Sequence, residues 1–373
     1  MSRSQQNADY LAQYNWMPYR NKLINGDFRI DQRFAGTSTT GSNYTPDRWK
    51  TLNTSGTITK QRVANGPFGN TYSLQMTVTS VGTRLSTDGF VIDQRIEADN
   101  SVDLQWGYST AKTCTLSFWI KNSLTGTYGG TINSGNNLRA YGFTYTVNAA
   151  STWEYKTIVI PSDVTGSSTA YPSGNGVGLY VRFGFGNGAN FSMTAGSWQA
   201  LTDQSDVTGS ASWAQTAGAV VNISMIQFEV GSVATPFENR PIGVELALCQ
   251  RYYYRRIGTE WSGSVQVSTG TLMFADKLPM IVRGGSPAPS ISLNSNITNA
   301  NYINAAPTGT QWSLTTSNIG NATKTGTCAL TPYISGDNSI GLIISGASWS
   351  ISVASLNLGS GAGGYLYEVS AEL

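Results

Sequence analysis

The stretch "TCTLSFWIK", residues 113–121, decides the fold class because polar and apolar side chains alternate along it. In an extended strand, successive side chains point to opposite faces of the sheet. Cys114, Leu116, Phe118 and Ile120 would therefore share one face, and the polar residues would share the other face with Trp119. This period of two predicts a half-buried β-strand.

Similar short runs continue beyond this strand. Three of them are "YKTIVIP" (155–161), "VGLYVRFGFG" (177–186) and "VVNISMIQFEVG" (220–231), with Gly, Ser, Asn or Pro at their boundaries. Many short strands without a convincing helix are typical of an antiparallel β-sandwich. We therefore expect an all-β chain whose residues 21–236 form a sandwich, most simply a jelly roll.

The composition excludes several kinds of function. Only 12% of the 373 residues are charged and the net charge is +2, which gives no electrostatic reason to expect nucleic acid or an acidic membrane as a partner. The chain has no histidine, the commonest general acid–base residue and metal ligand. Cys114, Cys249 and Cys328 lack metal-ligand spacing, which favours buried free thiols made in a reducing cytoplasm. We expect neither a metal nor a cofactor.

The N-terminal segment "MSRSQQNADYLAQYNWMPYR" (1–20) lacks the long apolar run of a signal peptide or membrane span, so no membrane insertion is expected. It does carry aromatic residues, among them Tyr10, Tyr14, Trp16 and Tyr19. Tyr10 and Tyr14 have the i,i+4 spacing of one helix face. This favours a peptide that becomes ordered when it docks on a partner, although a frayed terminus would have the same pattern.

A composition change divides the rest of the chain. In "FEVGSVATPFENRPIGVELALCQRYYYRR" (228–256), Pro241 suits a first helical turn, which predicts a connecting helix within 237–256. Its apolar stripe would consist of Ile242, Leu246, Cys249 and Tyr253. Charged residues become sparse after 256, and runs such as "SIGLIISG" (339–346) predict a second, smaller β domain over 257–373.

Two stretches also resemble a known family. "NKLINGDFRIDQRFAG…YTPDRWK" (21–50) and "QFEVGSVATPFENRPIGVELALCQRYYYRR" (227–256) resemble paired signatures of tail-fibre and receptor-binding proteins of tailed bacteriophages. In that family, the first signature opens a sandwich and the second closes it. The sequence between them is also similar to carbohydrate-binding jelly-roll modules.

The resemblance implies a fibre protein on the virion surface, attached to tail or capsid and synthesised in the host cytoplasm. Its partners would be other virion proteins and a host cell-surface polysaccharide. Members of the family are commonly trimers, so we expect a homotrimer with the helix stripe near its threefold axis. Residues 1–20 would dock on the virion, and residues 257–373 would face outward.

Two other functions stay open. A capsid decoration protein with a structural role would have the same composition. A polysaccharide depolymerase without histidine would need two carboxylates at glycosidase separation. The neighbouring pairs are Asp27 with Asp31, Asp93 with Glu97, Asp99 with Asp103, and Asp203 with Asp206. Surface carboxylates explain each pair equally well and no solenoid-length repeat is evident, so we predict that the chain is not an enzyme.

The glycan-binding candidates are aromatic. Trp119 would lie on the Thr- and Ser-lined face of its strand, as a sugar-stacking ring requires, or that face would pack on another element or subunit. In the outward domain, the candidates are Trp261, Tyr302, Trp312, Tyr333 and Trp349, each of which could instead belong to the core. Low charge suits neutral glycans, because polar side chains and aromatic rings bind them without desolvating ions.

Overall fold

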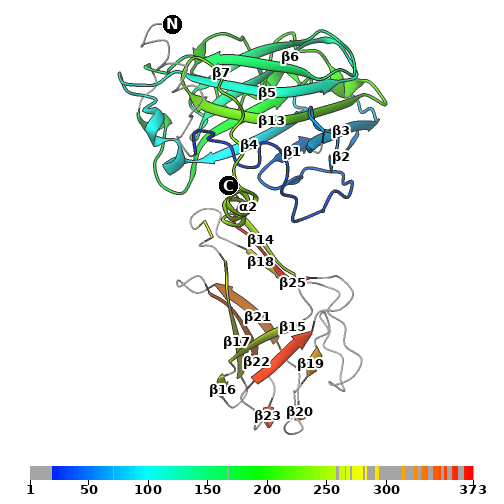
Figure 1. The fold of residues 1–373 in the computed structure, drawn as a ribbon, viewed down its shortest axis with the longest axis vertical. Helices are drawn as coiled ribbons and strands as arrows, with labels where there is room; N and C mark the ends of the chain where they lie inside the picture. Colours follow the sequence, from blue (N-terminus) through cyan, green and yellow to red (C-terminus); the bar gives the residue numbers. More distant parts are fainter. Residues whose placement is uncertain are drawn as a thin grey trace, which may run out of the picture. The chain divides into compact units, whose positions relative to one another are not determined.

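The computed structural model describes residues 19–257 except 70 and 166–167, followed by 260–264, 266–268, 271–279, 282–283, 290–293, 313–315, 323–325, 329–334, 339–345, 348–350, 355–359 and 365–372. Beyond residue 256, side chains are described only for 278, 279, 282, 283, 290 and 368–372. The described chain is nearly all β, with mostly antiparallel sheets, as predicted (Figure 1). It forms two compact units, one up to residue 246 and one over 247–372.

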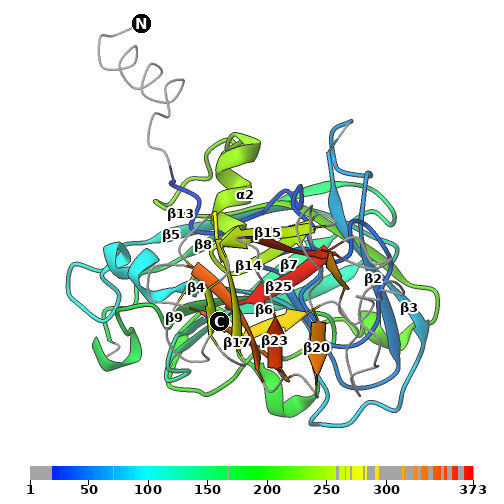
Figure 2. The same cartoon turned by 90° about the horizontal axis from the view of Figure 1, so that it is seen from below.

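Two antiparallel sheets form the sandwich of the first unit. One sheet has the order β2 (Thr57–Val63), β3 (Ser73–Ser80), β13 (Val220–Val230), β5 (Cys114–Asn122) and β8 (Glu154–Ile160). The other has the order β1 (Lys50–Asn53), β4 (Phe90–Glu97), β9 (Val177–Gly184), β6 (Gly126–Ser134), β7 (Ala140–Val147) and β11 (Trp198–Gln199). A short parallel pair is formed by β10 (Ser192–Met193) and β12 (Asp206–Val207). Figure 2 shows the β2–β3 hairpin at one edge of the sandwich.

The apolar inward face of β5 is confirmed, but its other face is not open throughout, because Thr115 and Ser117 are buried as well. Cys114, Leu116, Phe118 and Ile120 are all fully buried between the sheets, where they join the apolar residues of the facing strands. The Phe118 ring meets that of Phe183 edge-to-face, with centroids 5.0 Å apart. Burial raises the pKa of the Cys114 thiol to about 12, which keeps this thiol protonated and unreactive.

The second unit contains four small sheets among its described residues. The first has the order β14 (Tyr253–Ile257), β25 (Tyr365–Ser370), β18 (Ser290–Leu293), and the second has the order β15 (Glu260–Ser264), β24 (Ser355–Gly359), β19 (Ser313–Thr315). The other two are β16 (Gln266–Ser268), β17 (Thr271–Lys277), β22 (Ser339–Ser345), β21 (Ala329–Ile334), and β20 (Thr323–Thr325) with β23 (Ser348–Ser350). Buried Arg283 supports this unit, because its side chain donates to the carbonyl oxygens of Ala371 at 2.8 Å and Glu372 at 3.0 Å.

The connecting helix is shorter than the sequence suggested. Helix α2 covers Ile242–Gln250, and the tyrosine-rich end of the segment forms strand β14 instead. Consecutive aromatic residues favour extended backbone, and β14 finds a partner in β25 through the pairing of Tyr253 with Ser370. The Cys249 side chain is fully buried, as its sequence context predicted.

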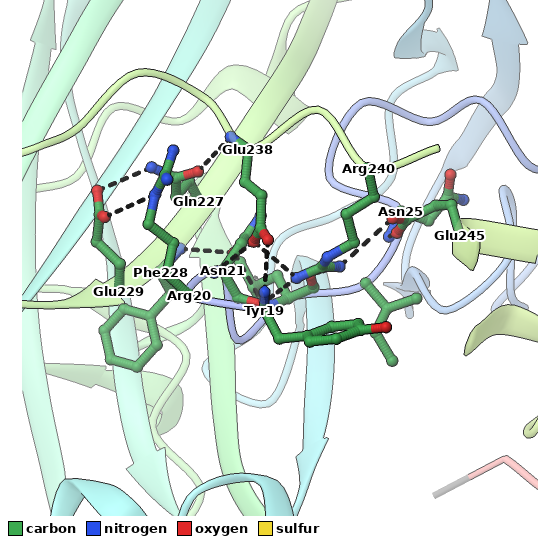
Figure 3. Close-up of polar contacts among 12 residues, drawn as sticks. Tyr19, Arg20, Asn21, Asn25, Gln227, Phe228, Glu229, Glu238, Arg240 and Glu245 are labelled. Atoms are coloured by element: carbon green, nitrogen blue, oxygen red, sulfur yellow. Dashed lines mark hydrogen bonds and ion pairs between the residues drawn. The ribbon is translucent and has the colours of Figure 1, made fainter. Parts of the chain in front are cut away.

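A buried arginine, Arg240, connects the chain segment that enters the sandwich with the segment that leaves it (Figure 3). The Arg240 guanidinium donates to the Glu238 carboxylate at 3.1 Å and to the Glu245 carboxylate at 3.4 Å. It also donates to the backbone carbonyl oxygens of Leu23, at 3.2 Å, and of Asn21. We call this group of five residues the clasp.

The carboxylates of the clasp complete the connection. Glu238 accepts the backbone N–H groups of Tyr19 at 2.6 Å and of Asn21 at 2.8 Å, and Glu245 accepts the N–H of Asn25. The Asn21 side chain then binds strand β13, accepting from the Phe228 N–H at 3.0 Å. The two stretches that resemble fibre signatures therefore meet in space, and each satisfies the backbone polar groups of the other.

We predict that Arg240→Met lowers the free energy of unfolding of this chain by about 3–5 kcal/mol, because the buried Glu245 carboxylate and the largely buried Glu238 carboxylate lose their common cation. Chemical denaturation followed by tryptophan fluorescence would measure the change. Lys22→Met is the matched control: Lys22 lies in the same segment, but its partner Asp103 is 48% exposed. The control should cost no more than about 1 kcal/mol. Equal effects of the two substitutions would show that the clasp does not stabilise the sandwich.

Candidate functional site, an aromatic groove on the sandwich

Trp119 lies on the outward face of β5, as the alternation predicted, and is only partly buried. Its cross-strand neighbour is Tyr155 of β8, whose ring centroid is 5.4 Å away. Phe68, from the β2–β3 loop, places its ring edge-on to Trp119 at 5.2 Å. Tyr155 is 45% exposed and Phe68 is 52% exposed. Three aromatic side chains thus form a cluster on the protein surface, and clustered exposed apolar groups commonly mark an interaction site.

A groove of about 410 Å³ follows this aromatic cluster. Its volume falls within the range of about 300–1,000 Å³ that is typical of small-molecule sites. The lining residues are Phe68, Ser117, Trp119, Tyr155, Met225, Ala234, Thr235, Pro236 and Phe237. They come from the β2–β3 loop, from three neighbouring strands and from the segment that follows β13.

A β-bulge in β13 places Met225 in the groove. The pairing of β13 with β5 shifts register between Ser224 and Gln227, and Met225 has a φ of 52°. Bulges re-aim side chains in this way. The N-terminal segment holds the bulge, because the Ile226 N–H donates to the Gly26 carbonyl at 2.9 Å. A Cβ at Gly26 would lie 2.2 Å from the Ile226 carbonyl oxygen, so glycine is required there.

The segment 234–237 forms one wall of the groove. It is fixed by Glu229, which is 2% exposed and accepts the Thr235 N–H at 2.8 Å. The Gln227 side chain donates to the Thr235 carbonyl at 3.2 Å. Thr235, Pro236 and Phe237 were not predicted to be site residues, because in the sequence they lead into the predicted helix. The sequence feature that could have indicated this wall is the Thr-Pro pair, which follows a predicted strand and a Gly-Ser turn.

None of the nine lining residues is Asp, Glu, Lys or Arg. The hydroxyl-bearing residues of the lining are Ser117, Tyr155 and Thr235, beside apolar ring faces. Ser117 is only 2% exposed and the Thr235 hydroxyl already donates to the Glu229 carboxylate, whereas Tyr155 is exposed. A charged ligand would lose its hydration in such a groove without gaining an ion pair. A neutral ligand with hydroxyls and apolar patches would match both kinds of lining.

The other predicted glycan candidates cannot be placed as side chains. Trp261, Tyr333 and Trp349 belong to strands β15, β21 and β23, whose side chains lie outside the described set. Tyr302 and Trp312 fall outside the described residues altogether. Trp119 is therefore the predicted candidate around which the structure gathers other aromatic residues.

The predicted docking residues Tyr10, Tyr14 and Trp16 also lie outside the described residues. Tyr19 is 54% exposed, and its ring lies 5.7 Å from the Arg240 guanidinium carbon. Its backbone N–H binds Glu238. The chain is thus already tied to its own sandwich at Tyr19, at the end of the segment predicted to dock.

The predicted apolar stripe is not one exposed helix face. Ile242 is 55% exposed, whereas Leu246 is partly buried and Cys249 is fully buried. Tyr253 lies in β14 and is 2% exposed. The stripe is interrupted because the helix ends at Gln250 and the chain becomes extended.

The paired carboxylates have other partners in the described part of the chain. Asp27 forms an ion pair with Arg29, and Asp206 accepts the N–H groups of Gly186 and Asn187, each at 3.0 Å. The described residues contain no cluster of three or more Cys, Asp or Glu that could hold a metal ion. They also contain no helix long and apolar enough to cross a membrane.

No family model matches this chain. No curated protein matches it either. Among solved structures, it is similar to the enzymatically active domain of tailspike protein 4 of bacteriophage CBA120, with 14% identity and a TM-score of 0.29. That match covers 58% of this chain but only 22% of the tailspike chain.

Carbohydrate-binding modules are also similar. The family 11 module of the Clostridium thermocellum cellulosomal cellulase Lic26A-Cel5E matches with 13% identity and a TM-score of 0.26, over 56% of this chain and 94% of the module. A family 11 module from Clostridium thermocellum in complex with a β-1,3-1,4-mixed-linked tetrasaccharide matches with 13% identity and a TM-score of 0.26, over 56% of this chain and 95% of that one.

A matched pair of adjacent substitutions tests whether Trp119 belongs to the surface. Phe118→Ala should cost about 3–5 kcal/mol of unfolding free energy, because it leaves a cavity in the core. Trp119→Ala should cost less, about 1–3 kcal/mol, because it loses two ring contacts of about 0.5–1.5 kcal/mol each and leaves no cavity between the sheets. Chemical denaturation of both variants would compare them. A cost for Trp119→Ala as large as that for Phe118→Ala would show that Trp119 is a core residue.

Proposed function

We propose that this chain binds a neutral glycan through the aromatic groove, and that it serves as a non-enzymatic attachment protein of a bacteriophage virion. The observation that carries the proposal is the groove, in which Trp119, Tyr155 and Phe68 present rings beside hydroxyl groups and no charges. Sugar rings have apolar faces and hydroxyl edges, so both parts of the lining find a partner.

Attachment to a virion is supported by the sequence resemblance and by what those residues do. The two stretches that resemble tail-fibre signatures supply the clasp and the groove wall, including Asn21, Arg240 and Thr235. The motif that closes the sandwich thus also shapes its candidate binding surface. In this proposal, the partner is a host cell-surface polysaccharide, residues 1–20 bind other virion proteins, and residues 257–373 face outward.

The binding experiment compares three forms of the labelled protein on cells of the bacterial host. Trp119→Ala should weaken binding at least about tenfold, because one stacking ring is lost. Tyr19→Ala is the control, since Tyr19 is also an aromatic residue, is 54% exposed and lies outside the groove. The third form lacks residues 257–373. Binding that is lost in this form but unchanged in Trp119→Ala would assign the receptor site to the second domain and contradict the groove.

Experiments on virions would distinguish an attachment function from the two alternative functions, decoration and depolymerisation. Virions that lack this chain should stay intact but fail to adsorb to the host. Reduced stability of the head with normal adsorption would instead indicate a decoration protein. Shortening of the host polysaccharide by the purified chain would indicate a depolymerase.

We also propose a homotrimer. Light scattering at micromolar concentration should give about three times the chain mass of 39.9 kDa. Ile242→Glu should reduce the mass toward the monomer, because Ile242 is an exposed apolar residue of the predicted interface. Val233→Glu is the control, since Val233 is 74% exposed and lies outside α2. A monomeric wild-type chain would rule out the trimer.

A further inference from the structure

A second cavity lies where two chain segments cross between the sheets. The segment from β4 to β5 and the segment from β8 to β9 each pass from one sheet of the sandwich to the other. Between them is a cavity of about 600 Å³, within the size range of about 300–1,000 Å³ for small-molecule sites. It is lined by Ser101, Val102, Leu104, Gln105, Trp106, Tyr108, Thr110, Tyr171, Pro172, Ser173 and Leu179. None of these residues lines the groove at Trp119.

Backbone hydrogen bonds hold the two crossing segments together. The Ala98 N–H donates to the Gly176 carbonyl at 2.8 Å, and the Asp99 N–H donates to that of Gly174 at 2.9 Å. Further along, the Gly107 N–H donates to the Asp163 carbonyl at 2.8 Å. The walls are therefore fixed before any ligand arrives, which lowers the entropy cost of binding.

Tyr171 is a prepositioned aromatic wall. Its hydroxyl donates to the Asp163 carboxylate at 2.6 Å, and Arg139 donates to the same carboxylate through Nε at 2.8 Å and Nη2 at 2.9 Å. The Tyr171 ring packs edge-on against Trp106, with centroids 5.8 Å apart. Because the hydroxyl is already engaged, the ring is the part of this side chain best placed to contact a ligand.

The rim of the cavity combines an exposed ring with free polar groups. Tyr108 is 57% exposed, although it lies beside a cavity that could bury it. The side chains of Gln105, Thr110 and Ser173 are exposed and make no hydrogen bond within the described part of the chain. As in the groove, none of the lining residues is charged.

We infer that this cavity is a second saccharide site, which takes the end of a neutral glycan. Tyr171 and Tyr108 would contact the apolar faces of the sugar, and Gln105, Thr110 and Ser173 would bind its hydroxyls. The neutral lining disfavours a uronic acid or a phosphorylated sugar, because its anion would lose water without gaining a cation. Trp106, Leu104 and Leu179 are buried and close the floor, so an end of a chain fits better than its middle.

Saturation-transfer NMR on the full chain tests this site with galactose, glucose and N-acetylglucosamine as neutral probes and galacturonate as the charged one. The test starts from Trp119→Ala, so that the groove is already impaired. This variant should still bind a neutral probe and should bind galacturonate more weakly. Adding Tyr108→Ala should weaken the remaining binding at least about tenfold, whereas adding Tyr108→Phe should preserve it, because the ring makes the contact. Tyr108 is exposed, so these substitutions should leave the fold intact, which circular dichroism would verify.

Failure of the second site is distinguishable from failure of the proposed function. If Trp119→Ala binds no neutral probe, or if Tyr108→Ala changes nothing, the cavity is not a saccharide site, whatever the groove does. Equal binding of galacturonate would also overturn the inference, since it would contradict the neutral lining. Conversely, the groove would be disproved by unchanged binding of Trp119→Ala to host cells, and the cavity would be unaffected by that result.

Discussion

The buried guanidinium of Arg240 is the interaction on which the sandwich and its groove depend. It neutralises Glu238 and Glu245, and those carboxylates in turn bind the backbone of residues 19–25. The N-terminal segment is thereby held against β13, where Gly26 accepts the Ile226 N–H at the bulge. The bulge turns Met225 into the groove. The buried ion pairs of the clasp thus help to determine the shape of the uncharged groove on the protein surface.

This arrangement explains how a chain with few charges uses them. Arg240 and Glu229 are both nearly inaccessible and bind backbone groups that no regular strand pairing satisfies. Lys60 is another example, with 2% exposure and hydrogen bonds to the Gly41 carbonyl and the Thr51 hydroxyl. Burial lowers the pKa of this ammonium group to about 8. These charged side chains thus stabilise the interior, whereas both candidate binding surfaces are lined by uncharged residues, many of them aromatic or hydroxyl-bearing.

Local patterns in the sequence predicted those features of the fold that are determined by residues close together in the chain. The period of two in 113–121 placed Phe118 in the core and Trp119 on the surface, because strand geometry alone determines which face a residue occupies. It could not predict that Phe68 and Pro236 would join Trp119, since that depends on contacts between distant segments. The clasp could not be predicted for the same reason, since Asn21 and Arg240 are 219 positions apart. The end of α2 was misjudged because pairing with β25 outweighed the helical spacing of Tyr253.

The neutral linings also restrict how tightly such surfaces can bind. Without a cation at Trp119 or Tyr108, neither electrostatic steering nor an ion pair contributes, and the free energy must come from ring contacts and hydroxyl hydrogen bonds. Those hydrogen bonds replace bonds to water, so each adds only about 0.5–1.5 kcal/mol. Weak sites become effective when several engage one surface, because the later contacts form at high effective concentration. The two proposed sites lie on separate segments of one sandwich and would supply this multiplicity within a single chain. A polysaccharide, which repeats its own units, is the kind of ligand that could engage both.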